Sequence, residues 1–223
     1  MREYHLFIFD LDGTLLDTLA DLAGSCNYAL KACGMPQRTM DEVRQFVGNG
    51  VRVLMQRAVP GGEENPLFVQ ALDCFRKHYL IHGQDNTAPY PGIIDMLRRL
   101  RFEGKKIAVV SNKFDAATKQ LCSHYFPELV DMAIGESEGI RRKPAPDTVL
   151  TAMRLLGVEP HDSIYVGDSD TDILTAKNAG ISCLSVTWGF RDRQFLIEHG
   201  ATTLISSPEE IIRTSEPRHD VMT

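Results

Sequence analysis

Short apolar runs that end in small or polar residues recur along the chain in the way typical of buried strands. Between several of them, apolar residues recur three and four positions apart and the segment ends at a glycine, which predicts a helix closed by a left-handed C-cap. The predicted strands are 6–11, 106–111, 132–135, 163–167 and 181–186, and the predicted helices are 93–100, 149–156 and 173–179. Strands that alternate with helices predict an α/β fold with a doubly wound, mostly parallel sheet covered on both faces.

One long stretch after the first strand breaks this alternation. No β-rich run appears between residues 16 and 88, and helical spacing dominates there instead. The predicted helices of this stretch are 15–33, 40–47, 51–59 and 67–79. We therefore expect residues 16–88 to form an inserted four-helix domain, and residues 1–15 and 89–223 to form the α/β core. Near the end, Ser207 and Glu210 form a capping-box pattern, and the polar tail from Ser215 is expected to be loose.

Composition narrows the class of partner and the compartment. The chain has 223 residues, 43% of them hydrophobic, and 24 Lys and Arg stand against 30 Asp and Glu, for a net charge of −6. This balance disfavours nucleic acid as a partner. The apolar runs are too short to span a bilayer, so no membrane association is expected. Five scattered cysteines without a C-x-x-C pair indicate neither a disulfide framework nor a zinc site, and they favour the cytoplasm.

The sharpest local feature is the sequence Asp10-Leu11-Asp12-Gly13-Thr14, where the first apolar strand stops. Side chains on a strand alternate between faces, so Asp10 and Asp12 can project together into the crevice at the carboxyl end of the sheet. Two adjacent anions become favourable if a divalent cation neutralises them, or if one carboxyl stays protonated and can donate its proton. The alternative is an ordinary acidic turn after a strand.

A second acidic cluster, residues 167–172, repeats this arrangement after the strand at 163–167 and before a helix. It contains Asp168, Asp170 and Asp172. The structural alternative is an N-cap, in which Asp170 or Thr171 satisfies free helix N–H groups. Capping explains one side chain but not three acids, so this cluster is a second candidate for the site.

Two further segments supply groups suited to a phosphate. Ser111 and Asn112 end the predicted strand at 106–111 and could hydrogen-bond phosphoryl oxygens, while Lys113 and Lys143 offer compact positive charges. Each signal is weak alone, because Ser and Asn commonly end strands and Lys143 could be a solvated cation in a proline-rich loop.

Taken in order, these elements resemble the haloacid dehalogenase superfamily. Its signature is met by Asp10-x-Asp12-Gly-Thr, Ser111, Lys143 and Gly167-Asp168-x-x-x-Asp172, and the resemblance covers nearly the whole chain. The helical insertion corresponds to that family's α-helical cap. The segment 46–54 together with Asn112-Lys113 is most similar to the phosphoglycolate phosphatases of the superfamily.

The resemblance implies a Mg²⁺-dependent phosphomonoester hydrolase that acts through an aspartyl phosphate. Asp10 would be the nucleophile and Asp12 the general acid and base. Asp10, Asp168 and the backbone carbonyl of Asp12 would hold the metal, with Asp172 as a ligand or in its outer shell. Ser111, Lys143 and backbone N–H groups near Gly13 would offset the phosphoryl charge, and Asn112 would contact the substrate. The partner would be a small phosphorylated metabolite, and the protein a monomer or homodimer.

Substrate choice is expected to lie in the inserted helices. Asn49 and Gly50 belong to a Gly-Asn-Gly turn between two predicted helices, and the second helix would direct free N–H groups at a small carboxylate such as that of 2-phosphoglycolate. The alternative is a turn that needs no substrate to explain it. Arg44 and Arg52 flank the turn as possible anion contacts.

Other activities would use the same core residues. A phosphosugar mutase like β-phosphoglucomutase, a pyrophosphatase and a broad sugar phosphatase differ in what reaches the aspartyl phosphate or which ester binds. A catalytically inactive phosphate-binding module is the alternative outside enzymes. Dehalogenation is disfavoured, because that reaction in the family does not need the acid that Asp12 supplies.

Overall fold

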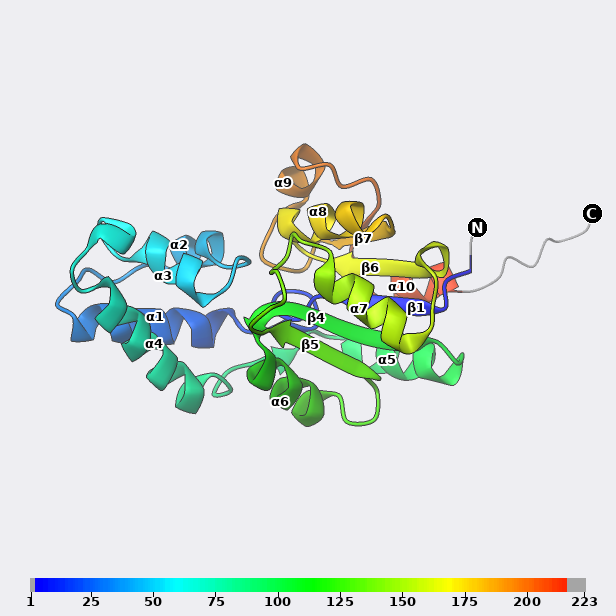
Figure 1. Cartoon of the computed structure of the whole chain (residues 1–223), viewed down its shortest axis with the longest axis horizontal. Helices are drawn as coiled ribbons and strands as arrows, with labels where there is room; N and C mark the ends of the chain where they lie inside the picture. The colour runs from blue at the N-terminus through cyan, green and yellow to red at the C-terminus, as the bar shows by residue number, and fades with distance from the viewer. Residues whose placement is uncertain (1–2, 216–223) are drawn as a thin grey trace, which may run out of the picture. The chain divides into compact units, whose positions relative to one another are not determined.

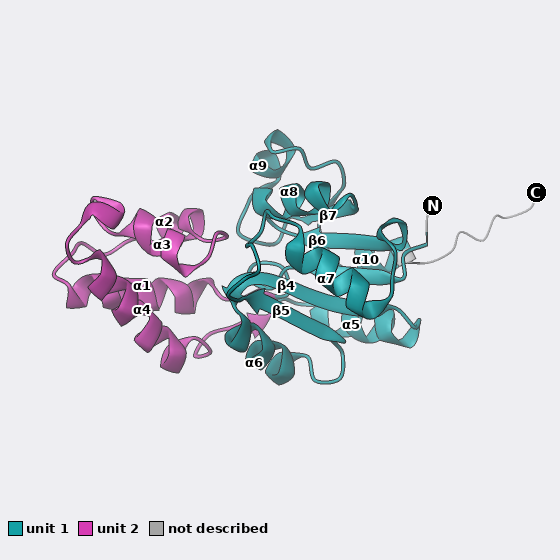
Figure 2. Ribbon diagram, in the orientation of Figure 1, with its two compact units in different colours: residues 1–15, 90–223 teal, residues 16–89 magenta. Residues whose placement is uncertain are grey.

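The computed structural model describes residues 3–215, and the chain divides into two compact units. Unit 1 comprises residues 1–15 and 90–223, and unit 2 comprises residues 16–89 (Figure 2). No helix in the described part of the chain combines the length and apolar character needed to cross a bilayer.

Unit 1 is built on a six-stranded sheet in which every neighbouring pair of strands is parallel. The order is β5-β4-β1-β6-β7-β8, so the first strand of the chain lies in the middle (Figure 1). The strands are β1 Leu6–Phe9, β4 Lys106–Phe114, β5 Met132–Glu136, β6 Ser163–Gly167, β7 Ser182–Val186 and β8 Leu204–Ile205. The predicted α/β fold with a mostly parallel sheet is confirmed.

Helices of unit 1 cover both faces of this sheet. Leu6 and Ile8 of β1 and Tyr165 of β6 form a buried cluster with α7 and α8. Because side chains alternate along a strand, Phe7 and Phe9 face the opposite layer, where α5 and α6 pack on β4. The helices are α5 Ile93–Phe102, α6 Asp115–Tyr125, α7 Asp147–Leu156, α8 Asp170–Ala179, α9 Arg193–Glu198 and α10 Pro208–Ser215.

Some elements of unit 1 differ from the sequence prediction. Helices α6 and α9 and strand β8 were not predicted, and β4 continues to Phe114, three residues past the predicted end. Helix α6 starts directly after β4 with no breaking Gly or Pro between them, and β8 has only two residues, too few for a pattern.

At α10 the Glu210 carboxylate accepts hydrogen bonds from the N–H groups of Ser206 and Ser207. Most of the predicted loose tail lies outside the described residues.

Unit 2 contains four α-helices, as its 3.6-residue apolar spacing predicts. They are α1 Leu19–Ala32, α2 Met40–Phe46, α3 Val51–Ala58 and α4 Phe68–His82, with a 3₁₀ turn at Gly62–Glu64. The sequence analysis missed a short antiparallel ladder between β2 Leu16–Asp17 and β3 Ala88–Pro89. Helix α1 therefore begins at Leu19 and not at Leu15. Two-residue strands are too short to show an alternating pattern.

The buried Asp21 of α1 fixes the segment that follows α4. Its carboxylate accepts hydrogen bonds of 2.8 to 3.0 Å from the backbone and side chain of both Asn86 and Thr87. Burial acts to raise the pKa of Asp21, but these hydrogen bonds outweigh it and lower the pKa below its ordinary value of 3.8. The two ends of unit 2 are thus joined through one ionised carboxylate.

We predict that Asp21→Asn destabilises unit 2 by about 2 kcal/mol at pH 7, because an amide NH₂ would then face donors that need an acceptor. The folded-state pKa lies below the unfolded value, so the stabilisation is present above pH 3.8 and is lost as the pH falls further. Urea unfolding measured from pH 7 to pH 3 tests this.

The matched control is Asp73→Asn on α4, whose carboxylate is 57% exposed and pairs with Lys77. It should change stability by less than about 0.5 kcal/mol. Equal effects of the two substitutions, or an Asp21→Asn penalty that does not shrink in acid, would contradict the assignment.

Candidate active site

The predicted site residues meet at the carboxyl ends of three neighbouring strands, β4, β1 and β6. Asp10 follows β1 directly, and its backbone N–H donates to the carbonyl of Val166 in β6 at 2.9 Å. Ser111 belongs to the last part of β4, and Asp168 follows β6. The parallel order of the sheet therefore gathers motifs that are far apart in the sequence.

Three carboxylates converge in this crevice. Asp10, Asp168 and Asp172 each place an oxygen within 4.8 Å of the others. Their exposed fractions are 8%, 1% and 0%, so water screens them little. Asp172 lies in the first turn of α8, and its carboxylate reaches back toward the two strand ends.

Lys143 is the cation at the centre of this cluster. Its Nζ lies 2.8 Å from Asp10 Oδ1 and 2.8 Å from Asp172 Oδ1, and it donates to the Tyr165 hydroxyl at 3.0 Å. The Tyr165 hydroxyl in turn donates to Asp172 Oδ1 at 2.9 Å. The sequence analysis did not single out Tyr165, because an aromatic residue inside a buried strand is typical of packing alone.

Asn112 holds the backbone of the central lysine. Its side-chain NH₂ donates to the Lys143 carbonyl at 3.1 Å, and its Oδ1 accepts the Lys143 backbone N–H at 2.9 Å. This pair of bonds fixes the loop that carries Lys143 against β4. The predicted contact between Asn112 and the substrate stays a prediction.

The capping residue of α8 also differs from the prediction. Ser169 is the N-cap, in place of Asp170 or Thr171, and it forms a capping box with Asp172. The Ser169 hydroxyl donates to Asp172 Oδ2 at 2.6 Å, and its backbone N–H donates to the same oxygen at 3.1 Å. Asp172 thus accepts four hydrogen bonds from protein donors, two at each oxygen, which fills its acceptor sites and favours an orienting function for this carboxylate over direct metal ligation.

Asp168 is held by the first motif and by the segment after β7. The Thr14 hydroxyl donates to Asp168 Oδ1 at 3.3 Å, and the Phe190 N–H donates to Oδ2 at 2.7 Å. Gly13 has a φ of +89°, and a Cβ at this position would collide with the Asp168 carboxylate. Gly13 is thus required both by its backbone conformation and by the close approach of the acid. The Trp188 indole donates to the Thr14 carbonyl at 3.0 Å.

The charges of this cluster are unbalanced, since three carboxylates surround one lysine. Burial, and next the charge of Asp172, raises the pKa of Asp10 well above its usual range. Burial and Asp172 raise the pKa of Asp168 to about 7. Burial alone would lower the pKa of Lys143, but Asp10 and Asp172 raise it above its ordinary value.

This imbalance fits a divalent cation. Its charge would favour the ionised forms of Asp10 and Asp168, and carboxylate oxygens are the ligands that hard cations prefer. Lys143 holds the Asp10 carboxylate through Oδ1 at 2.8 Å. Asp10 therefore presents an oriented carboxylate beside Asp168 and Asp172, where it could face a metal or an electrophile.

A second lysine, Lys113, forms an ion pair with Asp12. Lys113 Nζ donates to Asp12 Oδ1 at 2.9 Å and to Oδ2 at 3.0 Å. The Lys113 side chain is 5% exposed and that of Asp12 is 21% exposed. The Lys113 backbone N–H donates to the Ser111 hydroxyl oxygen at 3.1 Å. Asp12 is thus the more accessible of the two motif acids, with a cation of its own.

The predicted substrate residues Asn49 and Gly50 lie in unit 2, in the turn between α2 and α3. Gly48 and Gly50 have φ values of +112° and +82°, and Gly50 is the N-cap of α3. The flanking arginines pair with acids of their own unit: Arg44 with Asp41, and Arg52 with Glu63 through two bonds of 2.9 and 2.6 Å. Both guanidinium groups are therefore already paired with carboxylates.

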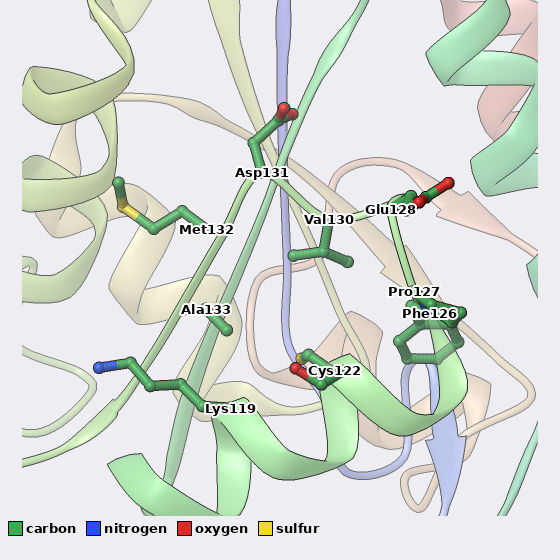
Figure 3. Close-up of a pocket in the computed structure, with 10 residues that line it drawn as sticks. Lys119, Cys122, Phe126, Pro127, Glu128, Val130, Asp131, Met132 and Ala133 are labelled. Carbon is green, nitrogen blue, oxygen red and sulfur yellow. The ribbon is translucent and has the colours of Figure 1, made fainter.

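A hollow of about 540 Å³ on unit 1 lies apart from these residues. Figure 3 shows its lining by α6, by the segment that follows α6 and by the start of β5. None of the predicted site residues lines it, and burial raises the pKa of its Cys122 to about 12, which leaves the thiol unreactive. The strand-end cluster, which has convergent acids and an oriented lysine, is the better candidate for catalysis.

Several known proteins are similar to this chain in sequence and in fold. A phosphoglycolate phosphatase of Mesorhizobium japonicum is 34% identical over 226 residues, covering 94% of this chain and 97% of that protein. A phosphoglycolate phosphatase of Aquifex aeolicus is 35% identical over 190 residues, covering 83% and 85%. The crystal structure of a proposed phosphoglycolate phosphatase from Lactobacillus delbrueckii subsp. bulgaricus matches with a TM-score of 0.92 and 36% identity, over 97% of this chain and 100% of that chain.

The family assignment rests on a match that is much longer than any single motif. A family model described as haloacid dehalogenase-like hydrolase matches residues 7–186, which span the predicted motifs from Asp10 to Asp172. The resemblance inferred from the sequence is confirmed, and the chain belongs to the haloacid dehalogenase-like hydrolases.

Proposed function

We propose that this hydrolase cleaves small acidic phosphate monoesters, with 2-phosphoglycolate as the first candidate, through a phosphoryl group carried on Asp10. The observation that carries the proposal is the Asp10 carboxylate, which is buried beside Asp168 and Asp172 and held by Lys143 through Oδ1. A carboxylate oriented in this way can act as a nucleophile toward phosphorus.

In the first step, Asp10 would form a bond to phosphorus while the bond from phosphorus to the ester oxygen breaks. Asp12 would give its proton to that departing oxygen, so the alcohol leaves neutral. In the second step, Asp12 would take a proton from water, the water oxygen would attack phosphorus, and Asp10 would leave as a carboxylate. Lys143, Ser111 and the N–H groups near Gly13 would offset the negative charge of the phosphoryl group.

The metal that we propose is Mg²⁺. Asp10, Asp168 and the backbone carbonyl of Asp12 would hold it, and Asp172 would orient Lys143 from outside that set. When bound, the ion supplies positive charge that reduces the repulsion between a carboxylate and a phosphate dianion. Asp168 is suited to this because Thr14 and Phe190 fix the carboxylate through one bond to each oxygen.

We predict that Mg²⁺ stabilises the folded protein in the absence of substrate. A ligand at 100 times its dissociation constant adds about 2.7 kcal/mol, which corresponds to a rise of about 5 °C or more in Tm for a chain of this size. Thermal unfolding with MgCl₂, compared with NaCl at equal ionic strength, measures the shift.

Asp168→Asn should abolish most of this Mg²⁺-dependent shift, whereas Asp170→Asn should retain it. Asp170 is the matched control because it lies two residues away, is half-buried, and does not belong to the group of Asp10, Asp168 and Asp172 that converges in the crevice. A wild-type Tm that does not respond to Mg²⁺, or a full shift in Asp168→Asn, would contradict the proposed metal site.

Two observations support an acidic substrate. The relatives from Mesorhizobium japonicum and Aquifex aeolicus are phosphoglycolate phosphatases by name. Gly50 caps the N-terminus of α3, where free N–H groups and the helix dipole favour a small anion. We also propose a cytoplasmic location, from the scattered cysteines, and a monomeric or homodimeric state.

A panel of esters tests this choice. We expect phosphate release from 2-phosphoglycolate to have a kcat/KM at least about tenfold above that of glycerol phosphate, hexose phosphates and pyrophosphate, because only the first pairs a phosphate with a nearby carboxylate. Asn49→Ala should reduce that preference and leave hydrolysis of neutral esters in place. A higher kcat/KM for pyrophosphate or a hexose phosphate, or interconversion of sugar phosphates without phosphate release, would replace the proposed activity with one of the alternatives.

A further inference from the structure

We propose that Lys113 positions the Asp12 carboxylate for proton transfer to and from the ester oxygen and water. This inference rests on the proposed function, in which Asp12 is the general acid and base. Lys113 Nζ donates to both oxygens of Asp12, at 2.9 and 3.0 Å, from a side chain that is only 5% exposed. Contact with both oxygens fixes the rotation of the carboxylate as well as its place.

The backbone of Lys113 is itself held by groups on either side of it. Its N–H donates to Ser111 Oγ at 3.1 Å, and its carbonyl accepts the Thr118 hydroxyl of α6 at 3.3 Å. The lysine thus extends from a fixed point at the end of β4 toward the loop after β1. Because the ammonium is buried, its attraction for a carboxylate is weakened little by water.

The two lysines of the site contact different acids. Lys143 contacts Asp10 and Asp172, whereas Lys113 contacts Asp12. Loss of Lys113 therefore leaves the nucleophile and its partners in place and removes the partner of the proton-transfer group. Asp12 is 21% exposed, so its carboxylate can be hydrated in the variant, and the expected defect is lost orientation and not unfolding.

Two esters that differ in their leaving group isolate this step. An alkyl phosphate such as 2-phosphoglycolate needs a proton on its departing oxygen, whereas p-nitrophenyl phosphate releases a stable phenolate without one. For Lys113→Met we expect kcat/KM to fall by about 10²-fold for the alkyl ester, at the low end of what acid–base catalysis contributes, and by less than about threefold for p-nitrophenyl phosphate. A purely structural defect would lower both values together.

Lys119→Met is the matched control. It removes the same charge from α6, where Lys119 is 61% exposed and pairs with Asp115. It should leave both kcat/KM values unchanged. In an Asp12→Asn background, Lys113→Met should lower kcat/KM for the alkyl ester by less than about a further twofold, because the lysine acts through Asp12.

Lys113→Arg provides a second test, since it keeps the charge on a longer, planar group. It should show the same selective loss of kcat/KM with the alkyl ester, at a smaller magnitude. It also provides the test if Lys113→Met does not fold. Equal losses with both esters would indicate a structural defect or a contact of Lys113 with the phosphoryl group, and unchanged kinetics would show that the ion pair does not affect catalysis; either result overturns the proposal. If the wild type hydrolyses neither ester, the proposed function fails and not this inference alone.

Discussion

The concentration of negative charge at one edge of the sheet is the constraint on which the site depends. Asp10, Asp168 and Asp172 are almost completely buried around a single lysine, and burial with mutual repulsion raises the pKa of Asp10 and of Asp168. An uncompensated buried charge is destabilising, so a fold keeps such a cluster only where further positive charge is available when it functions. A divalent cation would meet this need.

The parallel sheet is what makes the cluster possible. Strands β4, β1 and β6 lie side by side, so motifs from the start, middle and later part of the chain end at one edge. Thr14 bonds to Asp168 across 154 positions of sequence, and Gly13 allows that approach because it lacks a Cβ. Asn112 and Tyr165 then orient Lys143 from two different strands. The residues of the proposed site are therefore positioned by rigid elements, with few degrees of freedom of their own.

Much of this arrangement could be predicted from the sequence, for definable reasons. The acids stand directly after apolar strands, and the carboxyl ends of parallel strands converge, so the sequence alone predicts Asp10 and Asp168 at one site. The contacts of Asn112 and Lys113 could not be predicted, because a strand-end amide or lysine has many possible partners and only the register of β4 selects one. Ser169 was missed as the cap of α8 because three neighbouring polar residues are equally suited to that position.

The central claim is that Asp10 transiently carries the phosphoryl group, and mass spectrometry of acid-quenched enzyme tests it most directly. Protein mixed with Mg²⁺ and 2-phosphoglycolate, quenched during turnover and digested, should contain one phosphoryl group on the peptide that includes Asp10. The label should disappear after treatment with hydroxylamine, which cleaves acyl phosphates, and should be absent from Asp10→Asn. Turnover without any labelled Asp10 peptide, or a label that persists in Asp10→Asn, would contradict the account.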